Sequence, residues 1–202
     1  MALFDGTRLA VLDTETTGLD PGQGHGLVEV ACVALDGGEI GETWSTLVDP
    51  GRPIPPDASA VHGITDRMVR DAPGPAVVAA ELERRCAGRV LVFHNVAFDL
   101  PFLDAFMRSA GHGPLLHAVV DTLGLARGFF GQGGNSLGAL ATRFGLPAEA
   151  AHRALGDALT TARLLRVLAA RWESERGVRT VAELAAASQD ALRLTSRRSR
   201  VG

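Results

Sequence analysis

Two carboxylates, Asp13 and Glu15, stand one residue apart just after the apolar stretch of residues 9–12. Side chains in a strand alternate between its two faces, so Asp13 and Glu15 share one face if this stretch is a strand. Two adjacent anions are costly unless a cation or a shared proton neutralises them. The pair therefore predicts a site that attracts a cation.

Two further acids stand where a helix is expected to begin. Asp99 comes soon after the apolar stretch 89–93, and Asp157 lies in the segment HRALGD that opens a long amphipathic stretch. Carboxylate oxygens are suitable ligands for Mg²⁺ or Mn²⁺. Two such ions about 3.5–4 Å apart can hold the attacking and leaving oxygens of a phosphoryl displacement. Asp13, Glu15, Asp99 and Asp157 are therefore the candidate ligands of a two-ion site.

A histidine precedes the last of these acids. His152 and Asp157 are five residues apart, which is about 140° around an ideal helix. Their side chains meet at one site only if His152 lies on the loop just before the helix, and Gly156 makes that entry flexible. From such a position, His152 would take a proton from the attacking water as a general base.

Positioning these residues requires a sheet with helices around it. The order of the predicted elements indicates an α/β domain, with a mixed sheet and helices on both faces. The predicted strands are residues 8–12, 27–35, 39–48, 89–93 and 117–121, and the first three are antiparallel. The predicted helices are a short one after Thr65, then 73–87, 99–110, 136–144, 155–172 and a last one from Thr180. Residues 17–26 and the Pro-rich stretch 49–59 are predicted to be loops.

Composition narrows the class of protein. A length of 202 residues suits one domain with a modest extension, and 46% hydrophobic residues suffice for a packed core. We expect no membrane span and no signal peptide, and we expect Cys32 and Cys86 to be buried thiols of a cytoplasmic protein. The net charge of −3 gives no general attraction to nucleic acid. The chain has neither lysine nor tyrosine, which excludes mechanisms that need either residue.

Three segments, DTETTG, HNVAFD and HRALGD, resemble in order the three exonuclease motifs of the DEDDh 3′–5′ exonucleases. The resemblance covers residues 8–172 and implies a ribonuclease-H-like fold, whose sheet has three antiparallel strands followed by parallel ones. The segment VHGIT at residues 61–65 is similar to one found in the branch that contains the epsilon subunit of bacterial DNA polymerase III. The sister group has tyrosine in place of the motif histidine, so a chain without tyrosine fits the histidine type.

The resemblance implies a role for each matching residue. Asp13, Glu15 and Asp157 would hold one Mg²⁺ or Mn²⁺ ion, Asp13 would bridge to a second ion beside Asp99, and His152 would be the general base. Leu19 would be an apolar wedge against the terminal base. The 3′-terminal nucleotide would contact Thr16, Thr17, Gly18, Leu19, His62, Asn95 and Phe98. Residues 1–173 would form the exonuclease domain, and residues 174–202 a C-terminal extension with a short helix and a basic tail.

The expected function is a metal-dependent 3′–5′ exonuclease that releases nucleoside monophosphates from single-stranded or frayed 3′ ends. DNA is favoured over RNA because the chain keeps the threonine segment and the asparagine–phenylalanine motif. An RNA-trimming exonuclease and an inactive nucleic-acid-binding module on the same fold remain alternatives. A phosphatase with an Asp-x-Asp-x-Thr loop would need a lysine, and no twelve-residue calcium loop occurs. Taken singly, Asp99 is a common helix N-cap and Asp157 a common solvated residue.

The sequence near the C-terminus contains a segment that resembles a peptide for binding a protein partner. The hexamer QDALRL at residues 189–194 resembles the Gln-x-x-Leu-x-Leu/Phe peptide with which bacterial replication proteins bind the sliding clamp. The alternative is that Leu184, Leu192 and Leu194 form the apolar face of a terminal helix packed on the domain. Basic residues follow at Arg197, Arg198 and Arg200. The sliding clamp and the DNA polymerase III core are therefore the candidate protein partners.

Overall fold

The computed structural model of the protein describes residues 2–198, and the side chains of residues 3–193. The strands are β1 (Arg8–Thr16), β2 (Leu27–Asp36), β3 (Glu39–Leu47), β4 (Val90–Phe93) and β5 (Val119–Asp121). The α-helices are α1 (Pro56–His62), α2 (Asp66–Val69), α3 (Pro75–Cys86), α4 (Val96–Ser109), α5 (Thr122–Phe130), α6 (Leu137–Phe144), α7 (Ala154–Arg176) and α8 (Val181–Arg198). Two short 3₁₀ helices are η1 (Ala2–Phe4) and η2 (Pro21–Gln23).

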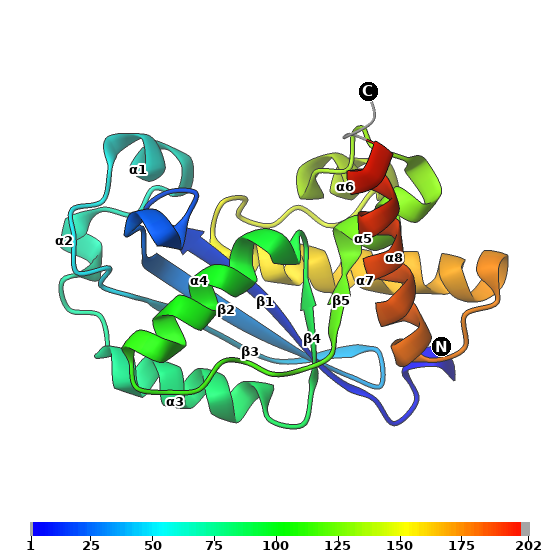
Figure 1. Ribbon diagram of the computed structural model, residues 1–202, viewed down its shortest axis with the longest axis horizontal. Helices are drawn as coiled ribbons and strands as arrows, with labels where there is room; N and C mark the ends of the chain where they lie inside the picture. Colours follow the sequence, from blue (N-terminus) through cyan, green and yellow to red (C-terminus); the bar gives the residue numbers. More distant parts are fainter. Residues whose placement is uncertain (1, 199–202) are drawn as a thin grey trace.

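The strands form one five-stranded mixed sheet with the order β3-β2-β1-β4-β5 (Figure 1). β1, β2 and β3 are antiparallel neighbours, and β4 and β5 run parallel to β1. This arrangement confirms the predicted fold class. β1 lies at the centre of the sheet, so residues at its end can be reached from helices on both faces.

Successive side chains of β1 point to opposite faces of the sheet, so they pack against different helices. Leu9 and Val11 pack in the core that α7 covers, whereas Ala10 and Leu12 pack in the core under α3 and α4. β1 does not end at Leu12, as the sequence predicted, because its pairing with β2 continues to Thr16. The same alternation therefore carries Asp13 and Glu15 to the α7 side of the sheet and Thr14 to the α4 side.

Helices cover both faces of the sheet (Figure 1). α7 packs on β1 and β2, and it buries Leu164, Leu165 and Leu168. α3 and α4 cover the opposite face. Both cysteines are free and buried, as predicted. Among the residues that the structure describes, no helix combines the length and the apolar composition that a membrane crossing requires.

Two helices lie where the sequence predicted none. α1 begins at Pro56, inside the predicted loop 49–59, because proline is well accommodated in the first turn of a helix. α5 contains Gly124 and Gly128, which lower helix propensity. Both glycines allow close packing, because a Cβ atom on Gly124 would lie 2.2 Å from the Ser188 carbonyl oxygen and one on Gly128 would lie 2.5 Å from the Trp172 ring.

The last helix is longer than the short one predicted and packs on α5 and β5. Its N-terminus is capped as expected, since the Glu183 N–H donates to the Thr180 hydroxyl at 3.2 Å. Leu184 is fully buried, and Leu192 is half-buried against Gly124 of α5. The sequence also predicted roles for Leu194 and for the arginines that follow it. These residues lie outside the side chains that the structure describes. The boundary at residue 173 stays a prediction.

Candidate active site

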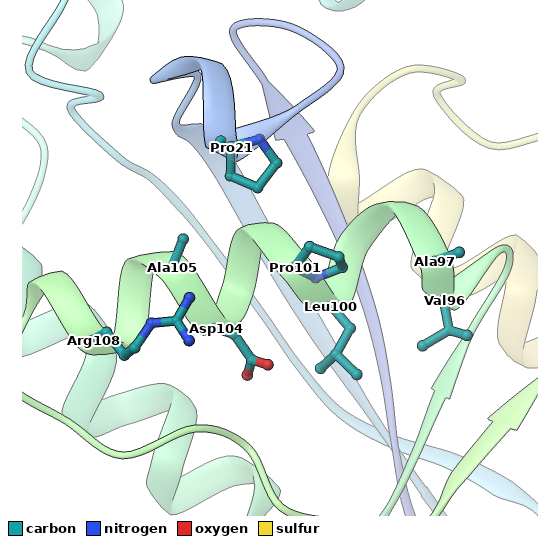
Figure 2. Close-up of a pocket in the computed structure, with 9 residues that line it drawn as sticks. Pro21, Val96, Ala97, Leu100, Pro101, Asp104, Ala105 and Arg108 are labelled. Carbon is teal, nitrogen blue, oxygen red and sulfur yellow. The ribbon is translucent and has the colours of Figure 1, made fainter.

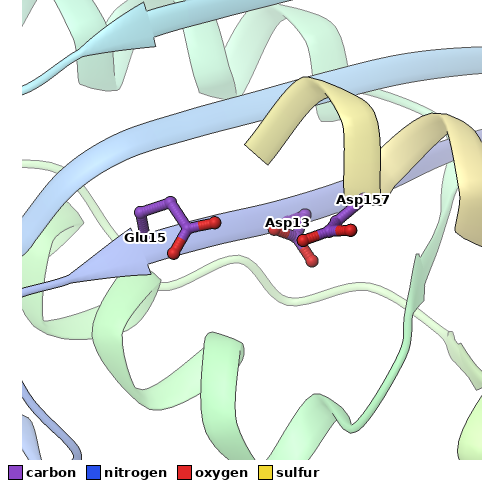
Figure 3. A group of neighbouring side chains, drawn as sticks. All are labelled: Asp13, Glu15 and Asp157. Carbon is purple, nitrogen blue, oxygen red and sulfur yellow. The ribbon is translucent and has the colours of Figure 1, made fainter. Parts of the chain in front are cut away.

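Three of the four predicted carboxylates converge where β1 ends and α7 begins. Asp13 and Glu15 point from β1, and Asp157 reaches them from the first turn of α7 (Figure 3). One carboxylate oxygen from each residue lies within 4.8 Å of the others. These hard oxygen donors suit a divalent cation such as Mg²⁺ or Mn²⁺, so the donor set fits the predicted metal.

Asp99 lies outside this group of three. It sits in the first turn of α4, where its Oδ1 accepts hydrogen bonds from the Thr14 N–H at 3.0 Å and the Thr14 hydroxyl at 2.7 Å. Asn95, and not Asp99, takes the N-cap position of this helix. Asp99 is buried on the α4 side of β1, and its charge still acts on Asp13.

The carboxyl groups hold protons more tightly than exposed acids do. Burial raises the pKa of Asp13 well above its usual value, and the charges of Asp99 and Asp157 raise it further. Burial, followed by the charge of Asp157, raises the pKa of Glu15 to about 8. Burial also raises the pKa values of Asp99 and Asp157, although the Thr14 and His152 hydrogen bonds oppose it. A bound cation would relieve this crowding of charge.

His152 lies on the loop immediately before α7, the position that a shared site with Asp157 requires. Its backbone φ is 56°, which is unusual for a residue other than glycine. Its N–H donates to Asp157 Oδ2 at 3.0 Å. The His152 side chain is exposed and lines, with Asp13, Asn95 and Asp157, a cavity of about 640 Å³.

The predicted substrate residues at the end of β1 form a closed loop. The Thr16 hydroxyl donates to the Gly18 carbonyl oxygen at 2.6 Å, and the Thr17 hydroxyl accepts from the Gly26 N–H at 3.0 Å. A Cβ atom on Gly18 would lie 2.4 Å from the His25 ring, so a side chain at this position would require that ring to move. Leu19 projects from this loop with 84% of its surface exposed.

The remaining predicted substrate residues come from two helices. His62, at the end of α1, is buried and accepts the Ile64 N–H at Nδ1, while its Nε2 has no hydrogen-bond partner among the described residues. Burial lowers the pKa of His62. Phe98, in the first turn of α4, is half-buried 5.4 Å from the Phe102 ring centroid. Neither His62 nor Phe98 lines the cavity that Asn95 shares with Asp13.

Sequence reasoning missed the groups that hold these segments in place. Asp121, at the end of β5, accepts hydrogen bonds from the N–H groups of Asn95 and Val96 and so fixes the start of α4. Glu29 of β2 accepts two hydrogen bonds from Arg153 and one from the Ala154 N–H. A signal for Glu29 was present, since it is the one acid inside an otherwise apolar stretch from Leu27 to Leu35.

A second cavity, of about 550 Å³, lies between η2 and α4. Figure 2 shows Pro21 of η2 facing Pro101 and Ala105 of α4, with Asp104 between these two residues along the helix and Arg108 beyond them. Pro21 follows the exposed Leu19 by two residues. This cavity therefore adjoins the loop that the sequence predicts to bind substrate.

Comparisons with known proteins agree with this geometry. The model of the exonuclease family RNase T matches residues 10–165. The chain is 36% identical to DNA polymerase III subunit epsilon of Treponema pallidum (strain Nichols) over 87% of this chain and 83% of that protein. It is 45% identical to a DNA polymerase III subunit epsilon-like protein of Rhodobacter capsulatus over 83% of this chain, but it spans only 25% of that longer protein.

Solved structures show the same fold. Exonuclease X in complex with 5′-overhanging duplex DNA superposes with a TM-score of 0.71 at 31% identity, over 89% of this chain and 99% of that one. Escherichia coli exonuclease I in complex with a dT13 oligonucleotide gives 0.74 at 18% identity, over 85% of this chain and 43% of that one, which supports the fold alone. The resemblance inferred from the three motifs is confirmed. With its motifs, sheet and epsilon-like relatives in agreement, this chain belongs to the exonuclease family.

Proposed function

We propose that this protein is a 3′–5′ exonuclease that hydrolyses DNA from its 3′ end and releases nucleoside monophosphates. The observation that carries the proposal is the convergence of Asp13, Glu15 and Asp157, whose oxygens lie within 4.8 Å of one another on an exonuclease fold. Such a cluster is unfavourable without a cation, as the raised pKa of Glu15 shows. A phosphodiester hydrolase would use it to bind metal.

Asp13, Glu15 and Asp157 would hold one divalent ion, and Asp13 together with Asp99 would hold a second. When bound, the ions would supply Lewis-acid stabilisation of the charge that develops on the phosphoryl oxygens. The Oδ1 atom of Asp99 is engaged by Thr14 through two hydrogen bonds. The Oδ2 atom, which neither of these two bonds engages, is the candidate ligand atom.

His152 would take the proton of the attacking water. Its exposed imidazole lines the same cavity as Asp13 and Asp157, and its backbone is anchored on Asp157 through the 3.0 Å hydrogen bond. The hydrogen bond fixes the position of the His152 backbone, and the imidazole remains exposed to solvent. A general base needs that combination, because it must reach water and then release its proton.

The 3′-terminal nucleotide would lie between the end of β1 and the start of α4. Leu19 is 84% exposed on a closed loop, which suits an apolar wedge against the terminal base. Asn95 would contact the nucleotide from the cavity that it shares with Asp13, and His62 and Phe98, which lie outside that cavity, would contact it from the neighbouring helices. A DNA substrate is supported by exonuclease X, whose solved structure is a complex with 5′-overhanging duplex DNA.

The epsilon relatives point to the DNA polymerase III core as a candidate partner. Clamp binding by residues 189–194 has less support, because Leu192 lies half-buried against α5, as expected if the helix is part of the domain. An RNA substrate stays the alternative activity.

The decisive experiment is digestion of matched DNA and RNA oligonucleotides that carry a 5′ label, with Mg²⁺ or Mn²⁺ present. A ladder that shortens by one nucleotide at a time from the 3′ end, faster on DNA, is expected. Faster digestion of RNA would favour the alternative, and release of the labelled 5′ nucleotide first would contradict the proposed polarity. Asp13→Asn protein purified in parallel controls for contaminating nucleases.

A further inference from the structure

One buried acid of the sheet is paired with the segment that carries His152. Glu29 of β2 is only 3% exposed, and both of its carboxylate oxygens are used. Arg153 donates from Nη2 to Oε1 at 2.6 Å and from Nε to Oε2 at 3.0 Å, and the Ala154 N–H donates to Oε2 at 2.9 Å. The pair therefore joins the central sheet to the start of α7, 124 residues along the chain.

Arg153 directly follows His152 and takes the N-cap position of α7. The preceding loop is packed tightly on the helix, because a Cβ atom on Gly156 would lie 2.1 Å from the Ala150 carbonyl oxygen. His152 itself holds a left-handed backbone conformation, with φ at 56°. Such a conformation persists only where its surroundings enforce it.

Stability alone does not account for this pair. A buried ion pair costs desolvation energy, and apolar residues of similar size often stabilise a protein as well or better. Glu29 also stands directly opposite Glu15 in the register of β1 and β2, so it adds a negative charge beside an already crowded cluster. A role in placing the adjacent loop explains why an acid occupies this position.

We propose that Glu29 and Arg153 are positioning residues that hold the backbone of His152 in place for proton transfer. The inference rests on the proposed function, in which His152 is the general base. Asp157 lies within the helix, where its N–H donates to the Arg153 carbonyl oxygen at 3.1 Å, whereas His152 lies outside it. Loss of the pair therefore displaces His152 more than it displaces Asp157.

The test uses Glu29→Gln and Arg153→Gln, measured singly and in a His152→Ala background. Each single variant is expected to lower kcat by roughly 10–100-fold, the cost of misplacing a catalytic group by about 1 Å. KM is expected to change little, and kcat is measured at saturating Mn²⁺, because Glu29 and Arg153 also act on the charge of Glu15. Glu29→Gln is the safer variant for folding, because the Arg153 side chain that it leaves unpaired is 43% exposed, whereas Arg153→Gln leaves the Glu29 carboxylate buried without its cation.

In the His152→Ala background, neither substitution should reduce kcat further, since the group that they position is already gone. The backbone amide of His152 should exchange its hydrogen faster in both single variants, because its bond to Asp157 is weakened. Glu175→Gln is the matched control, since it breaks the Arg171–Glu175 pair at the other end of α7 and should leave kcat unchanged.

Losses of kcat that add fully to that of His152→Ala would overturn the proposal. The proposal would also be overturned if the His152 amide exchanged its hydrogen as slowly in both single variants as in the wild type, even if kcat fell. The exchange measurement needs no nuclease activity, so it tests the positioning separately. A wild-type protein that cuts no oligonucleotide would refute the proposed function instead.

Discussion

Replacing Glu15 by glutamine should stabilise the metal-free protein while abolishing its activity. Glu15 lies beside Asp13 and Asp157, and burial, followed by the charges of Asp157 and Glu29, raises its pKa from 4.5 to about 8. The folded state therefore binds a proton at Glu15 more tightly than the unfolded chain does. Stability of the metal-free protein falls as the pH rises from about 4.5 to about 8, because the folded state holds more protons in that range.

The size of the effect follows from that pKa. A difference of about 3.5, at about 1.4 kcal/mol per pKa unit, corresponds to about 5 kcal/mol for complete ionisation of a fully shielded group. Glu15 is half-buried, and solvent screening reduces the expected cost to about 1–2 kcal/mol at pH 8. For a chain of this size, about 1 kcal/mol shifts Tm by roughly 2–4 °C. Glu15→Gln should therefore raise Tm by roughly 2–8 °C at pH 8, and by much less at pH 5.

Thermal unfolding in EDTA at pH 5 and pH 8 measures this difference. Glu175→Gln serves as the control with the opposite sign, because the Arg171 hydrogen bond lowers the pKa of Glu175 and its removal should not stabilise the protein. Saturating Mn²⁺ should raise the Tm of the wild type more than that of Glu15→Gln. A gain of equal size at both pH values, or a loss of stability at pH 8, would refute the electrostatic reasoning.

Four further predictions follow from the site. EDTA should abolish nuclease activity, and Asp13→Ala should lower kcat by at least ~10³-fold, which a nuclease assay with added Mg²⁺ would check. His152→Ala should lower kcat by about 10²–10⁴-fold while Mn²⁺ binding, measured by calorimetry, is retained; an unchanged rate would remove His152 from the mechanism. Mn²⁺ affinity should rise as the pH approaches 8, because Glu15 must lose its proton, and calorimetry in two buffers should detect proton release. Mismatched 3′ ends should be cut faster than paired ends, because unpairing a terminal nucleotide costs least at a mismatch, and equal rates would contradict a pocket that holds one frayed nucleotide.

Local features of the sequence were enough to predict the core of the site. The two-residue period of a strand placed Asp13 and Glu15 on one face, and the structure finds them there with Asp157. Helical geometry required His152 to precede α7, and it does. These predictions succeed because side-chain direction within one element depends on spacing along the chain.

Other features depended on contacts between distant segments. The sequence did not predict α5 because Gly124 and Gly128 lower its intrinsic helix propensity. In the folded protein these two glycines allow α8 and Trp172 to pack closely against α5. The sequence likewise offered no way to tell that Asp99 would be engaged by Thr14, 85 residues away.

The sequence by itself therefore determined the type of chemistry, because the acids and His152 lie in three short motifs whose internal spacing sets their direction. Only the tertiary structure decided how those motifs are held together. The bond between Glu29 and Arg153 joins residues 124 positions apart, and no local propensity encodes such a pair. It forms because the antiparallel pairing of β1 and β2 brings Glu29 beside Glu15, and the packing of α7 on those strands brings Arg153 to meet it.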